Sequence, residues 1–297
     1  MHKIRACIGI GVTGGQLLSF KVLEHSIRKT ASDNVILDII QLSRLVDSRF
    51  HENQLMQRTP FSLQRFLLAE HVCSNDYDYG IYLDSDMLLL GDISGLIIEF
   101  NRSNQNIETV SVKSEWNRRE QTSVLVFDRG GASTLSDCFK KFCDGLISYD
   151  ELMYLKNIEY GRGISWNWNS LEYLTSDTKL IHWTDVDTQP WLKKGNPNSG
   201  IWYSSLYDFI NTTDDGLSIL EQEVKLGHVL PSLLFLNVSG PSVTGTPLKY
   251  SLLDLFFIPP PRFQRIHSRF IRRALGPLFA CYRWAHLAIR NGQINVR

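Results

Sequence analysis

Short apolar runs alternate along this chain with segments of helical periodicity, and this alternation constrains the fold more than any other feature. Five runs have the length of a strand and are bounded by turn residues: 4–12, 35–40, 80–83, 122–127 and 179–183. Four other segments have helical spacing or helix-start signals: 16–29, 60–72, 131–143 and 150–157. Strands that alternate with helices predict an α/β fold with a Rossmann-like, mostly parallel sheet flanked by helices.

Composition narrows the class of protein further. The 297 residues are 43% hydrophobic and 21% charged, which is typical of a folded globular chain. Lys and Arg together number 31, as do Asp and Glu, so the chain as a whole has no general attraction for nucleic acid. The five cysteines contain no CxxC pair, which argues against a disulfide framework or a zinc knuckle. Without a signal peptide or an apolar run of membrane-spanning length, we expect a cytoplasmic protein.

The last part of the chain differs in charge from the rest. Residues 259–297 contain no Asp or Glu but eight arginines. Within 262–275 the arginines lie on one helical stripe and the apolar residues on an adjoining stripe, which predicts a basic amphipathic helix. We therefore expect a main domain over 1–250 and a tail over 251–297 that contacts an anionic membrane surface through 262–290. The alternative is a solvated helix packed on the main domain.

Two carboxylates follow the third apolar run, in the segment Tyr82–Asp86. Asp84 and Asp86 are two residues apart, and an extended chain points such residues to the same side. Two close carboxylates repel each other unless a cation, a proton or solvent neutralises them, and oxygen ligands suit Mg²⁺ or Mn²⁺. Because ligands bind beyond the carboxyl ends of strands in such sheets, we expect this segment to converge with 11–15 and with the chain after His182. A plain solvated turn is the alternative.

The segment YLDSDMLLLGDISGL, residues 82–96, resembles the donor site of glycosyltransferase family 8, the glycogenin-like retaining sugar transferases. Other segments follow in the family's order. They are TPFSLQRF at 59–66, TSVLVFD at 122–128, KLIHW at 179–183 and QPW at 189–191. The resemblance covers about residues 3–205, and it implies a fold of the GT-A type.

The resemblance also implies roles for individual residues. Asp84, Asp86 and His182 would hold Mn²⁺ or Mg²⁺. The nucleotide-diphosphate sugar would contact Arg65, Asp84 and Ser85, with Lys193 in place of a family lysine. Independently of the resemblance, glycine lacks a Cβ, so Gly11, Val12 and Thr13 are expected to approach the nucleotide, although a plain tight turn explains the glycines of 11–15 equally well. Asp150 and Gln121 would act on the donor sugar or the acceptor. The alternative for Asp150 is a plain acidic residue at the N-terminus of a helix. The implied reaction moves a hexose from a nucleotide-diphosphate sugar to a glycan or glycolipid acceptor, with retention of the anomeric configuration. The expected donor is a UDP-hexose.

This sequence departs from the family pattern at two places. Gln189 stands where relatives carry a lysine for the departing phosphate, so Lys193 or Lys194 is expected to substitute. Gln121, with the two residues after it, replaces an asparagine and a small pair before the fourth strand. These departures keep a non-catalytic nucleotide-sugar or membrane-binding module as an alternative. A third hypothesis is an Mg²⁺-dependent phosphohydrolase with Asp84 as its nucleophile.

Overall fold

The computed structural model describes residues 3–12, 14–45, 62–112, 122–236, 240, 248–255 and 257. It divides the chain into two compact units, residues 1–183 and 184–297. The predicted boundary at residue 250 stays a prediction. The predicted tail helix does too, because residues 258–297 lie outside the described residues. Within the described ranges, no helix is both long and apolar enough to cross a bilayer.

The first unit is built on a five-stranded sheet. Its spatial order is β2 (Val35–Gln41), β1 (Ile4–Gly11), β3 (Tyr79–Asp84), β6 (Val124–Asp128) and β5 (Ile107–Thr109). β1 runs parallel to both β2 and β3, whereas β6 is antiparallel to β3 and to β5. The sheet is therefore mixed: β6 is reversed and the other strands point the same way.

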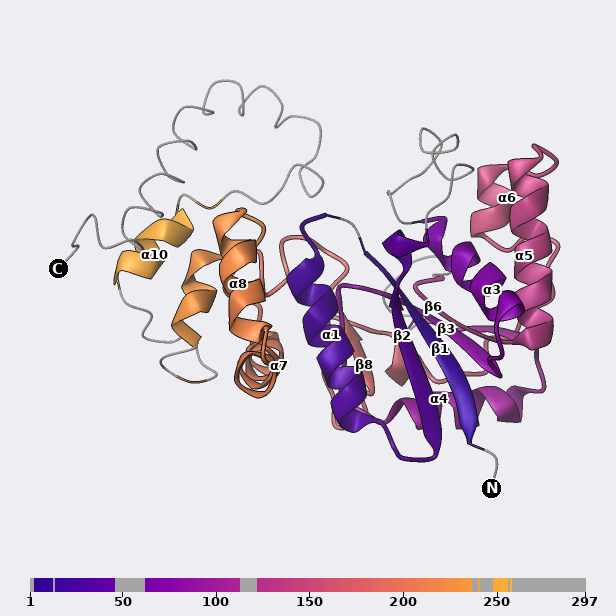
Figure 1. Cartoon of the computed structure of the whole chain (residues 1–297), viewed down its shortest axis with the longest axis horizontal. Helices are drawn as coiled ribbons and strands as arrows, with labels where there is room; N and C mark the ends of the chain where they lie inside the picture. Colours follow the sequence, from indigo (N-terminus) through magenta and orange to yellow (C-terminus); the bar gives the residue numbers. More distant parts are fainter. Residues whose placement is uncertain are drawn as a thin grey trace. The chain divides into compact units, whose positions relative to one another are not determined.

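Side chains of the central strands alternate between two hydrophobic layers. Ile81 and Leu83 of β3 point to the layer built with α1 (Leu17–Thr30) and α4 (Ile93–Ser103). Tyr82 points to the opposite layer. That layer is built with α3 (Gln64–Ser74) and α5 (Arg129–Cys143), against which the short α6 (Tyr149–Met153) packs. Figure 1 shows α1 on one side of the sheet and α3 and α5 on the other. Because both faces are covered, the carboxyl edge of the sheet is where a site can form.

A second, three-stranded sheet brings a late segment of the chain to this edge. Its order is β4 (Met87–Leu89), β8 (Leu180–His182) and β7 (Ser170–Leu171), the last of which follows the 3₁₀ turn η4 (Trp166–Trp168). β4 pairs antiparallel with β8, and Met87 lies opposite His182. The N–H of Trp183 also donates to the carbonyl of Asp86 at 2.9 Å. The chain after β8 therefore runs alongside the 84–86 turn.

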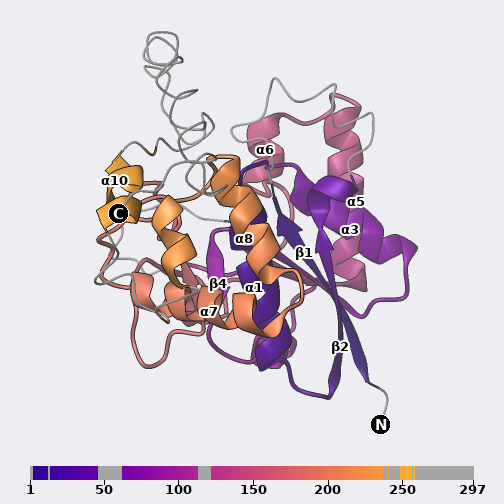
Figure 2. The same ribbon diagram turned by 60° about the vertical axis from the view of Figure 1, so that its left-hand side comes forward.

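The second unit is helical in its described part. It contains α7 (Ser199–Thr212), α8 (Gly216–Lys225), the 3₁₀ helix η5 (Pro231–Phe235) and α10 (Leu248–Leu255), and Figure 2 labels α7, α8 and α10. Trp191 and Trp202, both buried, lie with ring centres 5.2 Å apart and anchor its core.

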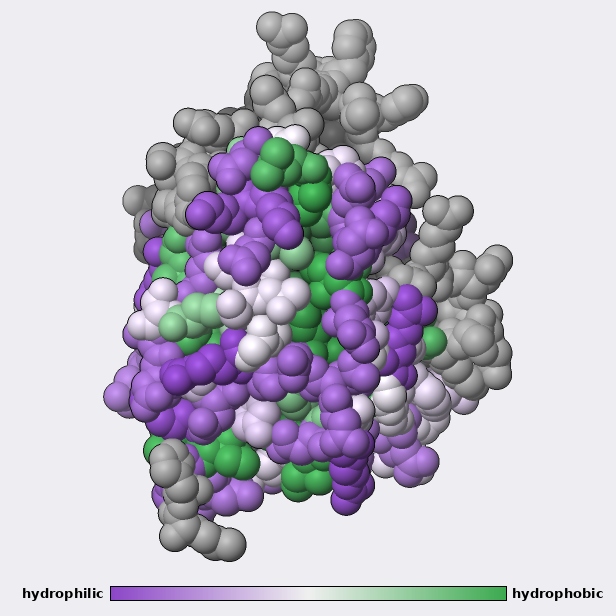
Figure 3. All heavy atoms as spheres, turned by 90° about the vertical axis from the view of Figure 1, so that its right-hand side faces the viewer, coloured by the Kyte–Doolittle hydropathy of each residue, from purple (hydrophilic) through white to green (hydrophobic). Residues whose placement is uncertain are grey.

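The five predicted strands are all present, and the helices that were predicted differ from the observed ones mainly at their ends. α3 begins at Gln64, after a turn at 62–63, while the predicted start at Thr59-Pro60 lies outside the described residues. α6 ends at Met153 instead of 157. The helix predicted over 131–143 is confirmed as α5. The surface seen from the side of α5 and α6 is mostly hydrophilic (Figure 3). This surface is expected where a helix such as α5 exposes Lys140 and Lys141 to solvent.

Candidate metal and nucleotide site

Asp84 ends β3, and a two-residue turn carries the chain to Asp86 and into β4. The carboxylates of both residues are partly buried, with 14% of each side chain exposed. Ser85 between them is buried, and its hydroxyl makes no hydrogen bond within the described part of the chain. The turn thus presents acidic groups and an unpartnered hydroxyl at the carboxyl edge of the sheet.

His182 completes a cluster with these two carboxylates. Its Nε2 atom lies 3.1 Å from an Asp86 oxygen and 4.0 Å from an Asp84 oxygen, and its side chain is 3% exposed. One ligand atom from each of the three residues lies within 4.8 Å of the others. The pairing of β4 with β8 produces this convergence, because it places His182 beside the turn that carries the carboxylates.

The other ring nitrogen of His182 is held by Asn169, which is fully buried. Nδ1 of His182 lies 3.0 Å from Oδ1 of Asn169. The amide nitrogen of Asn169 in turn donates to the carbonyl of Val110 at 3.3 Å and to the hydroxyl of Ser123 at 3.2 Å. The imidazole is therefore fixed from its far side by a buried polar network.

Asp84 is oriented by its neighbour on the same side of β3. The hydroxyl of Tyr82 donates to Oδ1 of Asp84 at 2.6 Å. The guanidinium carbon of Arg65, on α3, lies 4.8 Å from the centre of the Tyr82 ring. A Cβ added at Gly11 would lie 2.5 Å from the Tyr82 hydroxyl oxygen, so the absence of a side chain at Gly11 leaves room for this arrangement.

Charge and burial act against each other in this cluster. Burial raises the pKa of Asp84, and the Asp86 carboxylate raises it further. Burial alone lowers the pKa of His182, but the two carboxylates outweigh burial and raise it above its ordinary value. The Asp84 shift comes first from burial and the His182 shift from the attraction of the carboxylates, and both shifts show that the cluster favours a positive charge. A bound divalent cation supplies such a charge.

The donor set fits a hard or intermediate divalent cation. Two carboxylates offer oxygen ligands of the kind that Mg²⁺ and Mn²⁺ prefer, and a neutral imidazole is a suitable third ligand for Mn²⁺. The buried hydroxyl of Ser85 leaves a further polar group beside the cluster. The residues present therefore fit a metal centre that also contacts a polar ligand.

Gly11 lies beside the cluster at the end of β1, while its predicted contact with a nucleotide, and that of Val12, stay predictions. Gly11 is the register partner of Asp84 in the pairing of β1 with β3. The side-chain amide of Gln64 fixes Val12 in both directions, accepting from its N–H at 3.1 Å and donating to its carbonyl at 3.3 Å. Thr13 lies outside the described residues.

Arg65, on α3, is buried against the segment that precedes β6. It donates to the backbone carbonyl of Ser62 at 3.1 Å, and to the backbone carbonyl of Thr122 at 2.7 Å and the hydroxyl of the same residue. Its positive charge acts to lower the pKa of Asp84, which offsets part of the rise caused by burial and by Asp86. Gln121, the residue immediately before Thr122, lies outside the described residues.

Asp150 and Lys193 do not join the cluster through any contact that the structure describes. Asp150 is exposed in the first turn of α6, next to the capping box formed by Ser148 and Glu151. Its predicted role in the reaction stays a prediction, as does that of Lys193. Lys193 belongs to the second unit and pairs with Asp187 at 3.0 Å.

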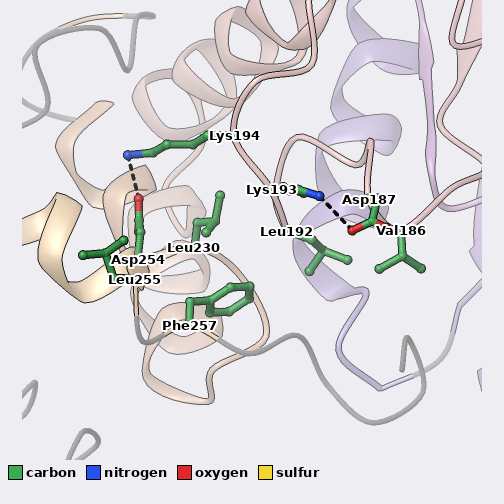
Figure 4. Close-up of a pocket in the computed structure, with 9 residues that line it drawn as sticks. All are labelled: Val186, Asp187, Leu192, Lys193, Lys194, Leu230, Asp254, Leu255 and Phe257. Carbon is green, nitrogen blue, oxygen red and sulfur yellow. Dashed lines mark hydrogen bonds and ion pairs between the residues drawn. The ribbon is translucent and has the colours of Figure 1, made fainter. Parts of the chain in front are cut away.

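The second unit contains a cavity of its own, of about 560 Å³. Figure 4 shows Lys193 paired with Asp187 and Lys194 paired with Asp254 around it. Apolar side chains, among them Leu230 and Phe257, line the remainder. Lys193 and Lys194, the two residues expected to substitute for the lysine that Gln189 replaces, are thus both paired with carboxylates.

Sequence comparisons and structural comparisons give different amounts of information about this chain. No protein-family model matches it, and no curated protein matches its sequence significantly. The apo structure of the bifunctional glycosyltransferase WbbM matches with a TM-score of 0.51 at 12% identity, over 75% of this chain and 52% of that one. The fold is of the GT-A type.

Two other glycosyltransferases are similar at lower TM-scores. GlyE of Streptococcus pneumoniae TIGR4 gives 0.49 at 12% identity, over 77% of this chain and 65% of that one. The galactosyltransferase LgtC, in complex with donor and acceptor sugar analogues, gives 0.40 at 11% identity, over 68% and 95%. The chain therefore spans only about half to two thirds of the length of GlyE and WbbM. At 12% identity the WbbM match supports the GT-A fold and assigns no role to any individual residue.

Three residues of the site carried no assigned role in the sequence interpretation. Tyr82 could have been found, because it lies two residues before Asp84 on the same side of a strand. Gln64 and Asn169 had no such signal, since their partners Val12 and His182 are reached only through the fold.

Proposed function

We propose that this chain is a metal-dependent glycosyltransferase that moves a hexose from a nucleotide-diphosphate sugar to a glycan or glycolipid acceptor. The observation that carries the proposal is the cluster of Asp84, Asp86 and His182 at the carboxyl end of β3 in a GT-A fold. The structural neighbours are glycosyltransferases, which supports the same class of reaction. UDP as the nucleotide and retention of the anomeric configuration rest on the family resemblance.

The residues of the site have separable roles in this proposal. Asp84, Asp86 and His182 would hold Mn²⁺ or Mg²⁺, which when bound stabilises the negative charge that develops on the leaving diphosphate. The pairing of Gly11 with Asp84 keeps the backbone at the end of β1 close to the carboxylates, where it would contact the nucleotide. Arg65 supplies a fixed positive charge whose orientation is already set by its hydrogen bonds.

The test is Mn²⁺-dependent hydrolysis of a panel of nucleotide sugars, comparing the wild type with Asp86→Ala. We expect release of UDP from one or two donors, and a loss of about 100-fold or more in the variant because a fixed electrostatic contact is removed. Asp137→Ala, which removes an exposed carboxylate on α5, is the matched control and should retain full activity.

The same assay separates the alternatives raised by the sequence. Release of phosphate from simple monoesters would support the phosphohydrolase. Binding of a nucleotide sugar without turnover, by the wild type with Mn²⁺ present, would support the non-catalytic module. Turnover that persists unchanged after chelation of divalent metals would contradict the proposed function.

We also propose that the tail contacts an anionic membrane surface, so that the protein is peripheral to the cytoplasmic side of a membrane. This proposal rests on the eight arginines and the absence of acidic residues after residue 258. It is independent of the metal site and has its own test below.

A further inference from the structure

We propose that Asn169 is a positioning residue for the metal site, because it fixes His182 in the one tautomer that can bind a metal through Nε2. The inference rests on the proposed metal-dependent function and adds to it a residue outside the ligand set. Asn169 touches none of the reacting groups in this proposal. It acts only through the imidazole ring.

The first step of the argument is that the Asn169 amide has a single allowed orientation. Its side chain is 0% exposed, and one of its ends lies 3.3 Å from the backbone carbonyl of Val110. A backbone carbonyl can only accept a hydrogen bond. The amide nitrogen must therefore face Val110 and the nearby hydroxyl of Ser123, and Oδ1 must face His182.

The second step assigns the proton on the histidine ring. Oδ1 of Asn169 has no hydrogen to donate, so the 3.0 Å contact with His182 requires the proton to be on Nδ1. In the neutral ring, Nε2 then carries the lone pair. Nε2 is the atom that lies 3.1 Å from Asp86 and 4.0 Å from Asp84, so the lone pair faces the carboxylates.

The third step concerns why Asn169 itself does not move. It lies between η4 and β7, and its amide is tied to the chain just after β5 and to the chain just before β6. Ser123, one of these partners, directly follows Thr122, which accepts hydrogen bonds from Arg65. The orientation of the histidine is thus coupled to the same buried segment that holds the arginine. Partners of this kind set the tautomer and direction of metal-binding histidines.

The first experiment measures Mn²⁺ affinity directly, from the electron paramagnetic resonance signal of free Mn²⁺. We expect Asn169→Ala to weaken binding by about 10- to 100-fold, the usual range for loss of such a partner. Asn167→Ala is the matched control, since Asn167 is two residues away and its side-chain oxygen makes no hydrogen bond within the described residues. Its affinity should equal that of the wild type. Equal affinities for Asn169→Ala and the wild type would overturn the positioning role.

The second experiment observes the wild-type protein, so it applies even if Asn169→Ala does not fold. The ring nitrogens of ¹⁵N-histidine-labelled wild type are observed by NMR with Mg²⁺ bound, and His182→Gln identifies the signal among the eight histidines. We expect a proton on Nδ1 and none on Nε2 of His182. A proton on Nε2 would overturn the inference, and a merely structural asparagine would not fix this signature.

The two proposals fail in different ways. Absence of Mn²⁺ binding by the wild type would overturn the metal site and, with it, the role of Asn169. Tight binding by the wild type that is insensitive to Asn169→Ala would overturn only the positioning role and leave the proposed function standing.

Discussion

Gly11 shows how a residue without a side chain can shape the site. In the register of β1 and β3 it lies opposite Asp84, and the space beside it is filled by the hydroxyl of Tyr82. That hydroxyl is the group that holds Asp84 through a 2.6 Å hydrogen bond. The geometry of the carboxylate therefore depends on a residue that touches it only through the tyrosine.

Replacing Gly11 with alanine should damage both stability and metal binding. The new Cβ would lie 2.5 Å from the Tyr82 hydroxyl oxygen, so the tyrosine must move and its bond to Asp84 must break or lengthen. Overpacking of this kind costs about 1–3 kcal/mol of unfolding free energy. Urea unfolding and Mn²⁺ titration would measure the two effects.

The control for this prediction is Gly163→Ala in the same unit. A Cβ at Gly163 meets no atom closer than 3.6 Å, so its unfolding free energy should change by less than about 0.5 kcal/mol. Equal stability and equal Mn²⁺ affinity in the two variants would contradict the role of the space beside Gly11.

At the scale of residues, what the sequence could predict depended on how far apart along the chain the contacting residues stand. Asp84 and Asp86 stand together in a motif, and the grouping of His182 with them depended on the order of segments in a resembling family. The contacts of Asn169 and Gln64 bridge segments 13 and 52 residues apart. Such contacts are set by the packing of helices and strands, which no local pattern of residues encodes.

At the scale of elements, the sequence predicted the strands of the central sheet better than the elements around them. The central strands are continuous apolar runs because both of their faces are covered. β4 and β5 have three residues each, and β7 has two, which are lengths too short to show a period, whereas the equally short β8 was predicted from the longer run 179–183. Helix α4 was also missed, although its N-cap, Asp92, stands in the motif itself.

Asp92→Ala should weaken the start of α4. The Asp92 carboxylate accepts hydrogen bonds from the N–H of Ser94 at 2.9 Å and from its hydroxyl at 2.7 Å. Loss of such a cap costs about 1 kcal/mol of unfolding free energy. Asp92→Asn keeps a side-chain oxygen at the cap and should retain most of the stability, so urea unfolding of all three proteins at pH 7 tests the role of the cap.

The contribution of Asp92 should also depend on pH in a defined direction. Burial acts to raise its pKa, but hydrogen bonds from Ser94 and Ser32 outweigh burial, and the pKa in the folded protein is lowered. Its charge therefore stabilises the fold fully above the ordinary carboxyl pKa of about 4, and this stabilisation is lost as the pH falls through the lower folded value. The difference between wild type and Asp92→Ala should be constant from pH 7 to 5 and should shrink only below pH 4. A difference that shrinks between pH 7 and 5 would contradict the assignment.

At the scale of the whole molecule, the metal ligands all belong to one unit. Asp84, Asp86 and His182 lie within residues 1–183. A fragment of residues 1–187 should therefore bind Mn²⁺ with the affinity of the whole chain, provided that circular dichroism shows it to be folded. The same fragment with Asp86→Ala should not bind. A folded fragment without Mn²⁺ affinity would show that the site needs residues beyond the first unit.

The charge asymmetry of the chain predicts where it contacts a membrane. Arg265, Arg269 and Arg272 lie on one stripe of the predicted basic helix. Each arginine near an anionic surface contributes about 1 kcal/mol, so replacing the three with glutamine should weaken binding to phosphatidylserine vesicles by about 100-fold. Vesicle sedimentation of the full chain measures this. Glutamine at the exposed Arg44, Arg102 and Arg162 of the first unit is the matched control, since it removes the same charge elsewhere. Equal losses in the two variants would mean that net charge, and not the tail, determines binding.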